Sequence, residues 1–177
     1  FYLCENTLIT YQEFPEDDFK NIRSRIEMPN ARIRKRKTDY LTYALIDTIV
    51  DHYMPMVERF GEKIELLENN ILGNQESADF LNQLFLYKKE ISFLRKTIRP
   101  VRELIMTFSK IEHVLVEKKN LIFISDLKDN IFVVNEAIEL YSGLLNDMLS
   151  LHDSQASRRL NEIMRVLTVF SVIFIPI

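Results

Sequence analysis

The chain has 177 residues, of which 47% are apolar, and it carries a formal net charge of −3 at pH 7. So large an apolar fraction can form a core and argues against an intrinsically disordered chain, while the near-neutral charge gives no case for nucleic-acid binding. The single cysteine, Cys4, excludes an internal disulfide and a cysteine-rich zinc site, and it is typical of a reducing compartment.

The first thirty residues predict a small β portion followed by a short helix. Residues 1–13 contain two runs of strand-forming side chains, and residues 19–26 form an amphipathic pattern that Pro29 ends. Two strands alone are marginally stable, so we expect them to complete a sheet whose other strands precede Phe1. Because Phe1 is not an initiator methionine and no signal peptide follows it, we expect a piece of a longer protein.

Two long helices are predicted next, over residues 38–72 and 78–110, because apolar side chains recur every three or four residues in both segments. The basic run over residues 32–37 is interpreted as a solvated helix start, with a phosphate- or lipid-binding patch as the alternative. Residues 111–120 are expected to be a short linker. Since strands are predicted only at the start, the expected fold class is mainly α with a small N-terminal β portion.

The last helix is the longest, and Ser125 is its predicted N-cap with Asp126 in the first turn. Its apolar residues recur three or four apart for longer than in an ordinary globular helix: Leu127, Ile131, Val134, Ile138, Tyr141, Leu145, Met148 and Leu151. About fifty residues give a rod of about 75 Å, and a small domain cannot cover one face of such a rod. The rod therefore needs other helices, other subunits or a membrane.

The composition of this predicted helix changes from charged to apolar near its C-terminal end. After a polar collar that includes Arg158, Arg159 and Arg165, residues 166–177 contain no charge. This run covers about 18 Å, whereas a bilayer core needs about 20 residues. We interpret the run as the truncated start of a first transmembrane helix, because basic residues mark the cytoplasmic flank. A buried C-terminal core helix is the alternative.

Three blocks of sequence resemble one known family. They are RKRKTDYLTYALID at residues 34–47, RKTIRPVRE at residues 95–103, and NEIMRVLT at residues 161–168 followed by IFIP at residues 173–176. In content, order and approximate spacing the blocks resemble the CorA family of divalent-cation (magnesium) channels, and the likeness covers nearly the whole chain. The family's Gly-Met-Asn signature, which follows the first membrane helix, would lie just beyond Ile177.

The resemblance implies a division of the chain into four parts. Residues 1–30 would be the C-terminal part of a cytoplasmic α/β domain, and residues 31–120 would be a long helical pair of that domain. Residues 121–165 would be the stalk helix, which enters the truncated transmembrane helix at residues 166–177.

Two carboxylates on the rod form the first candidate site. Asp126 and Asp129 lie three residues apart, so both can point to one side of the helix. Carboxylates suit hard cations such as Mg²⁺, although an acidic helix start gives the same pattern. The resemblance implies more, since family members place an acid at Asp126 that helps to hold a regulatory metal between subunits, and Asp129 matches an acid in some members. The expected cofactor is Mg²⁺, both as regulator and as transported ion.

The second candidate site is one edge of the rod near its end. The residues of this edge recur at alternating steps of three and four: Asn161, Met164, Thr168, Ser171 and Ile175. Such an edge ordinarily packs against a partner helix. The resemblance implies instead that it lines the pore of a pentamer, together with the adjacent Leu167. Asn161 would then form an amide ring at the mouth, Met164 and Leu167 an apolar constriction, and Thr168 and Ser171 a set of oxygens for a hydrated ion.

We do not expect an enzyme, because no nucleophile, base and oxyanion donor occur together and the three histidines are scattered. The resemblance implies a subunit of a homopentameric channel that conducts Mg²⁺, with Co²⁺ or Ni²⁺ as further candidates, across the cell (inner or plasma) membrane. Most of these residues would lie on the cytoplasmic side. The expected partners are further copies of the chain, membrane lipid and divalent cations, but not nucleic acid. The alternatives are a ZntB-like zinc transporter and a soluble helical scaffold that dimerises through the long helix.

Overall fold

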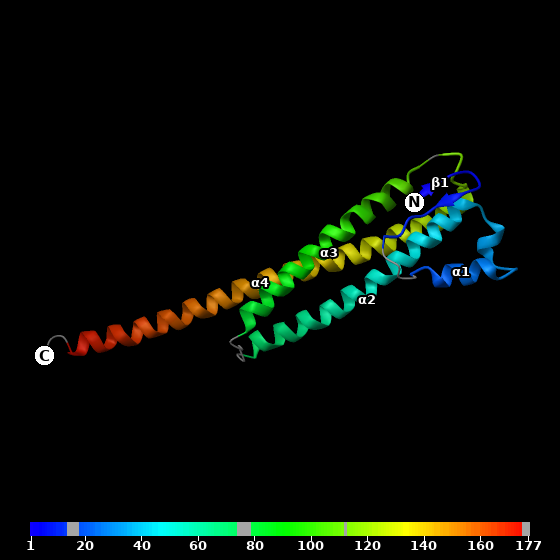
Figure 1. Ribbon diagram of the computed structural model, residues 1–177. Helices are drawn as coiled ribbons and strands as arrows, with labels where there is room; N and C mark the ends of the chain where they lie inside the picture. The colour runs from blue at the N-terminus through cyan, green and yellow to red at the C-terminus, as the bar shows by residue number, and fades with distance from the viewer. Residues whose placement is uncertain (14–17, 74–78, 112, 175–177) are drawn as a thin grey trace. The chain divides into compact units, whose positions relative to one another are not determined.

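The computed structural model describes residues 1–13, 18–73, 79–111 and 113–174. The elements follow one another along the chain as Figure 1 shows: β1 Tyr2–Leu3, β2 Leu8–Ile9, α1 Lys20–Glu27, the 3₁₀ helix η1 Arg32–Lys35, α2 Thr38–Leu72, α3 Phe80–Phe108, the 3₁₀ helix η2 Lys118–Asn120, and α4 Leu121–Phe174. The described chain is therefore mainly α with a small N-terminal β portion, which confirms the expected fold class.

The predicted elements are present with small shifts at their ends. The two strands pair antiparallel, with Tyr2 opposite Ile9 and Leu3 opposite Leu8. The helix predicted over residues 38–72 coincides with α2. The prediction that the last helix begins at Ser125 is wrong, because α4 begins at Leu121 directly after η2. Ile124 is 1% exposed and packs in the core, so the apolar face of the helix extends back past Ser125 to its true start.

The chain divides into two compact units, of which the first comprises Phe1–Phe60 and Phe93–Ile138. In this unit a cluster of apolar side chains joins α1 and η1 to the start of α2: Ile22, Ile33, Tyr40, Ala44 and Leu45. The Thr38 hydroxyl donates a hydrogen bond to the backbone oxygen of Cys4 at 2.8 Å, which ties the hairpin to the first residue of α2. The start of α2 is therefore held by the hairpin and by the cluster.

Within the same unit the start of α2 also lies beside the start of α4. The Tyr40 and Phe123 rings meet edge to face at 5.3 Å between centroids, and Tyr43 lies 5.5 Å from Phe123. The basic run is not only a solvated helix start, because Arg36 is half-buried and its guanidinium lies 5.7 Å from the centre of the Phe123 ring. These contacts hold the two helices side by side and in the same direction at this end.

The second unit comprises Gly61–Ser92 and Glu139–Ile177. Its core consists of large side chains from α2, α3 and α4 that are at most 4% exposed: Ile64, Leu67, Ile71, Phe80, Leu84, Ile91, Leu145 and Met148. The Lys88 ammonium donates a hydrogen bond to Asn146 Oδ1 at 2.7 Å, which joins α3 to α4 at the edge of this core. Each apolar side chain buried in this way stabilises the unit by about 1.5–3 kcal/mol.

The two helical glycines of α2 and α4 predict opposite effects of an added methyl group. A Cβ at Gly61 would lie against the Tyr141 phenol, 2.6 Å from Cζ, whereas a Cβ at Gly143 meets nothing within 4 Å. Gly143→Ala is therefore expected to raise the free energy of unfolding by about 0.5–1 kcal/mol, because alanine loses less backbone entropy in a helix. Gly61→Ala is expected to lower it by about 1–3 kcal/mol through overpacking. Urea unfolding of both variants measures the difference, and a stabilised Gly61→Ala would contradict the packing around Tyr141.

Candidate functional site

The predicted acidic pair lies near the beginning of α4, on the part of the helix that belongs to the first unit. Asp126 and Asp129 are one helical turn apart and both are exposed. Asp126 lies close enough to α2 for its charge to raise the pKa of both Tyr43 and Asp47. The structure therefore brings Asp126 beside a second acid that is distant in the sequence.

A tyrosine and an aspartate of α2 form a hydrogen-bonded pair at this place. The Tyr43 hydroxyl donates to Asp47 Oδ2 at 3.1 Å. Burial raises the pKa of Tyr43, and the negative charge of Asp47 raises it further. Burial is also the largest cause that raises the pKa of Asp47, followed by the charge of Asp51, while the Tyr43 hydrogen bond and the charge of Arg25 oppose the shift. The carboxylates here repel one another, and a cation would relieve that repulsion.

No sequence pattern had assigned Asp47, Asp51 and Tyr43 to this site. All three lie in the periodic stripe of α2, where Asp47 is half-buried and Asp51 is exposed. A carboxylate within an otherwise apolar stripe is the signal that could have drawn attention to Asp47, because a buried charge is costly without a partner. In the described ranges of the chain, no group of three or more histidine, cysteine or acidic side chains is arranged to hold a metal ion.

The raised pKa of Asp47 predicts the pH dependence of stability at this position. The ordinary carboxyl pKa is 3.8, and the folded state raises it. The stability that protonated Asp47 contributes is therefore fully present below the ordinary pKa and is lost as the pH rises through the raised one. Asp47→Asn should therefore stabilise the chain at pH 7, because it removes the burial cost of the charge and the repulsion by Asp51, of which the repulsion alone contributes about 0.2–0.5 kcal/mol. Urea unfolding at pH 7 and near pH 3 tests this.

In that experiment the gain should vanish near pH 3, where Asp47 is protonated in both states. Glu65→Gln is the matched control, because Glu65 is an exposed carboxylate on the same helix. A gain of the same size at both pH values would show that repulsion at Asp47 is not the cause.

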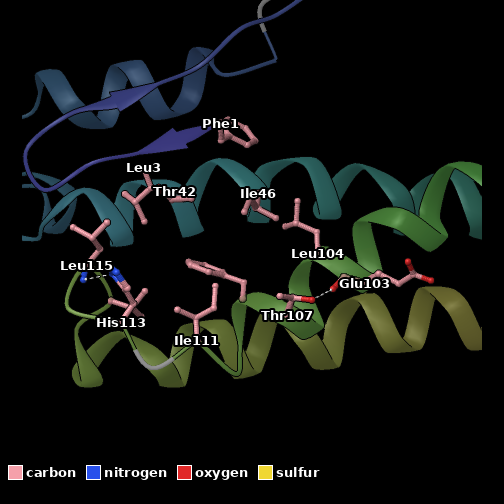
Figure 2. A pocket seen from close by; sticks show the side chains of 12 residues that line it. Phe1, Leu3, Thr42, Ile46, Glu103, Leu104, Thr107, Ile111, His113 and Leu115 are labelled. Carbon is pink, nitrogen blue, oxygen red and sulfur yellow. Dashed lines mark hydrogen bonds between the residues drawn. The ribbon is translucent and has the colours of Figure 1, made fainter.

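A separate cavity of about 640 Å³ lies in the first unit between β1, α2 and the end of α3. Figure 2 shows that apolar side chains such as Leu3, Ile46 and Leu104 form much of its wall. The Thr107 hydroxyl donates to the backbone oxygen of Glu103 at 2.9 Å, so this polar group already has a partner within its own helix. The cavity is therefore apolar in character and is not an arrangement for a cation.

The predicted edge of the rod, which we name the seam, lies on the last part of α4. Asn161, Met164, Leu167 and Thr168 are exposed and Ser171 is half-exposed, while Ile175 lies outside the described residues. The Thr168 hydroxyl donates to the backbone oxygen of Met164 at 2.8 Å, which leaves its lone pairs available to a further donor or cation. No described side chain of this chain covers the edge, so it is open to a partner.

In the last part of α4, side chains are exposed around the full circumference of the helix. Every residue from 156 to 170 is exposed, and the large apolar side chains among residues 160–174 are 53–68% exposed: Leu160, Ile163, Met164, Val166, Leu167, Val169, Phe170, Val172, Ile173 and Phe174. A continuous exposed apolar surface of this kind marks a site of interaction with protein or membrane. Among the described residues, no helix meets the length and hydropathy needed to cross a bilayer by itself.

Comparison with known proteins identifies the family. The family model described as "CorA-like Mg2+ transporter protein" matches residues 1–177, which is the whole chain. The chain belongs to this family. The resemblance inferred from the three sequence blocks is thereby confirmed at the level of the family.

Two relatives of this CorA-like chain are particularly informative. The cobalt/magnesium transport protein CorA of Thermotoga maritima is 31% identical over 175 residues, which are 99% of this chain and 50% of that protein. The solved structure of the CorA magnesium transporter from Methanocaldococcus jannaschii matches with a TM-score of 0.73 and 18% identity, covering 88% of this chain and 48% of the other. The structural match supports the fold. This CorA-like chain spans about half the length of both relatives.

Proposed function

We propose that the chain is a cytoplasmic and stalk fragment of a subunit of a homopentameric channel that conducts Mg²⁺ across the cell membrane. Co²⁺ and Ni²⁺ are further candidate ions. The observation with the most weight is that α4 is exposed on all sides from residue 156 to 170. A helix of this length with large apolar side chains on every face is stable only when other chains or lipid cover it.

The distribution of polar side chains on this part of α4 supports a pore. Asn161, Thr168 and Ser171 recur on one edge, and from residue 166 onward the helix carries no charge around them. In a ring of parallel copies these edges would face a shared axis, where oxygens can replace or hold the water around a cation. Met164 and Leu167 would narrow the same axis with apolar side chains, which is how a pore closes by losing its water. The other faces of α4 would contact neighbouring subunits and lipid.

The acidic site supports regulation by cytosolic Mg²⁺. Asp126 is exposed on the face where Asp47 and Asp51 accumulate negative charge, and oxygen ligands of this kind suit a hydrated Mg²⁺. In the proposed mechanism Mg²⁺ joins Asp126, with Asp129 one turn away, to a neighbouring subunit and holds the closed state. When cytosolic Mg²⁺ falls, the carboxylates repel and the subunits loosen. The ion can shift this equilibrium only because it binds the closed state more tightly.

Asp126→Ala in the full-length transporter tests this mechanism. Removing one ligand per subunit should move the midpoint for inhibition by cytosolic Mg²⁺ to a concentration about 5–150 times higher, the usual range for a coupling of this kind. The midpoint is measured as current, or as Mg²⁺ uptake into liposomes, against internal Mg²⁺. Asp153→Ala is the matched control, because its side chain is 72% exposed on the same helix and lies outside the acidic site. An unchanged midpoint in Asp126→Ala would exclude Asp126 as the regulatory ligand.

A further inference from the structure

Asp39, in the first turn of α2, is an acid with no exposed surface. Its two carboxylate oxygens accept three hydrogen bonds. Oδ1 accepts from the backbone N–H of Tyr40 at 2.9 Å, and Oδ2 accepts from the backbone N–H of Glu117 at 2.8 Å and from Asn120 Nδ2 at 2.7 Å. One buried side chain therefore binds the start of α2, the segment before η2 and the residue that precedes α4.

Asn120 completes this connection from the other side. It is 1% exposed and immediately precedes Leu121, the first residue of α4. Its Oδ1 accepts a hydrogen bond from Arg36 Nη1 at 2.7 Å, while its Nδ2 donates to Asp39. We name the three side chains Arg36, Asp39 and Asn120 the α2–α4 latch. Both hydrogen bonds of the latch are charge-assisted, which makes them of the strong kind, and the one between Asp39 and Asn120 is buried.

The latch is the first of two successive contacts between α2 and α4, and a third pair of residues follows them at the same spacing. Asp39 meets Asn120 first, and one turn later the Tyr43 ring meets Phe123 at 5.5 Å. The same spacing of four residues on α2 and three on α4 leads from Tyr43 and Phe123 to Asp47 and Asp126, and the charge of Asp126 contributes to the raised pKa of Asp47. Each step advances by about one turn on both helices, so the position of the latch determines which residues of α4 stand opposite Asp47.

We propose that Asp39 is a positioning residue that fixes the axial register of α4 against α2 and thereby keeps Asp126 opposite Asp47. This inference rests on the proposed role of Asp126 as a Mg²⁺ ligand. Asp39 itself does not contact the cation. It acts through Asn120, because a slip of α4 by one turn would place a different residue opposite Asp47.

Only a carboxylate satisfies the three donors at this position. An asparagine in place of Asp39 has nearly the same shape, but one of its two polar atoms is an amide nitrogen that can only donate. In either orientation of the amide, that nitrogen faces at least one of the donors Tyr40 N–H, Glu117 N–H or Asn120 Nδ2. Asp39→Asn therefore weakens the latch without opening a cavity, and Asn120→Ala weakens it from the α4 side.

The register is tested first without any metal. In a Cys4→Ser background, the pair Asp47→Cys and Asp126→Cys is treated with a short bis-maleimide, and the pair Asp47→Cys and Asp129→Cys reports on a position one turn away. We expect the ratio of the first crosslinking rate to the second to fall when Asp39→Asn or Asn120→Ala is added. A general loosening of the fold changes both rates together and leaves the ratio the same. An unchanged ratio in both variants overturns the proposal.

The consequence for the cation is tested in the chain with its native acids. Mg²⁺ alone is titrated while the thermal midpoint and calorimetric heat are followed. Asp39→Asn should raise the Mg²⁺ concentration at half-saturation about tenfold, as is typical for residues that orient a metal ligand. Ile105→Val is the matched control, since Ile105 is fully buried on α3 in the same unit and lies outside the latch. It should lower stability and leave the Mg²⁺ midpoint unchanged.

The two experiments separate failure of the inference from failure of the proposed function. If the crosslinking ratio falls and the Mg²⁺ midpoint rises only in the latch variants, the positioning role of Asp39 is supported. If Asp126→Ala abolishes Mg²⁺ binding but Asp39→Asn leaves it unchanged, the positioning role is overturned and the metal site stands. If Mg²⁺ has no effect on the native chain, the metal role of Asp126 is overturned together with the functional part of this inference.

Discussion

Replacement of Leu127 by alanine is expected to lower the free energy of unfolding by about 2–5 kcal/mol, because it removes a fully packed side chain and leaves a cavity. Leu127 is 0% exposed and lies on the face of α4 that packs within the first unit. The loss is measured by urea unfolding, followed by circular dichroism at the helical band. It is expected to be among the largest effects of any single substitution in α4, since the other faces of this helix are exposed.

The control for Leu127 lies on the same helix, at a position where the side chain is exposed. Ile122 is 63% exposed, and Ile122→Ala is expected to change the free energy of unfolding by no more than about 0.5 kcal/mol. Equal losses at Leu127 and Ile122 would contradict the orientation of α4 in the structure. A small loss at both positions would show that α4 does not depend on the first unit for its stability.

The second large effect is expected in transport. In the full-length form of the proposed channel, Met164→Ser should raise Mg²⁺ flux at inhibiting concentrations of cytosolic Mg²⁺ by about tenfold or more, which corresponds to a barrier lowered by about 1.4 kcal/mol or more. The physical reason is that a hydroxyl ring keeps water in a constriction that apolar side chains would empty. Met164 is 60% exposed on the seam, so the substitution leaves the packing of this chain intact. Flux into liposomes with a Mg²⁺-sensitive dye measures the effect.

Val166→Ser is the matched control for Met164→Ser. Val166 is 55% exposed, and two residues place it about 200° around the helix from Met164, so it faces away from the seam. It should leave the flux at inhibiting Mg²⁺ unchanged. If Val166→Ser raises the flux and Met164→Ser does not, then another edge of α4 faces the axis.

The sequence by itself determined the helices and the family. The three- and four-residue spacing of apolar side chains predicted α2 over residues 38–72, and the sequence blocks at residues 34–47, 95–103 and 161–168 indicated the CorA family that the family model confirms. Both signals are local. A helix is specified by neighbours three and four positions apart, and each block of the family signal is a continuous run of residues. The position of the seam follows for the same reason, since Asn161, Met164 and Thr168 belong to one unbroken helix.

Only the tertiary structure decided how distant residues combine. Asp39 and Asn120 are 81 positions apart, and no spacing rule connects them, yet they share a buried hydrogen bond of 2.7 Å. The same is true of Asp47 and Asp126, whose proximity depends on how α2 and α4 lie against each other. The capping pattern around Ser125 also did not predict the true start of α4 at Leu121. The burial of Ile124, which continues the apolar face before Ser125, is a feature of the packed fold. Local patterns fix which faces are apolar, whereas the pairing and register of those faces depend on packing across the fold.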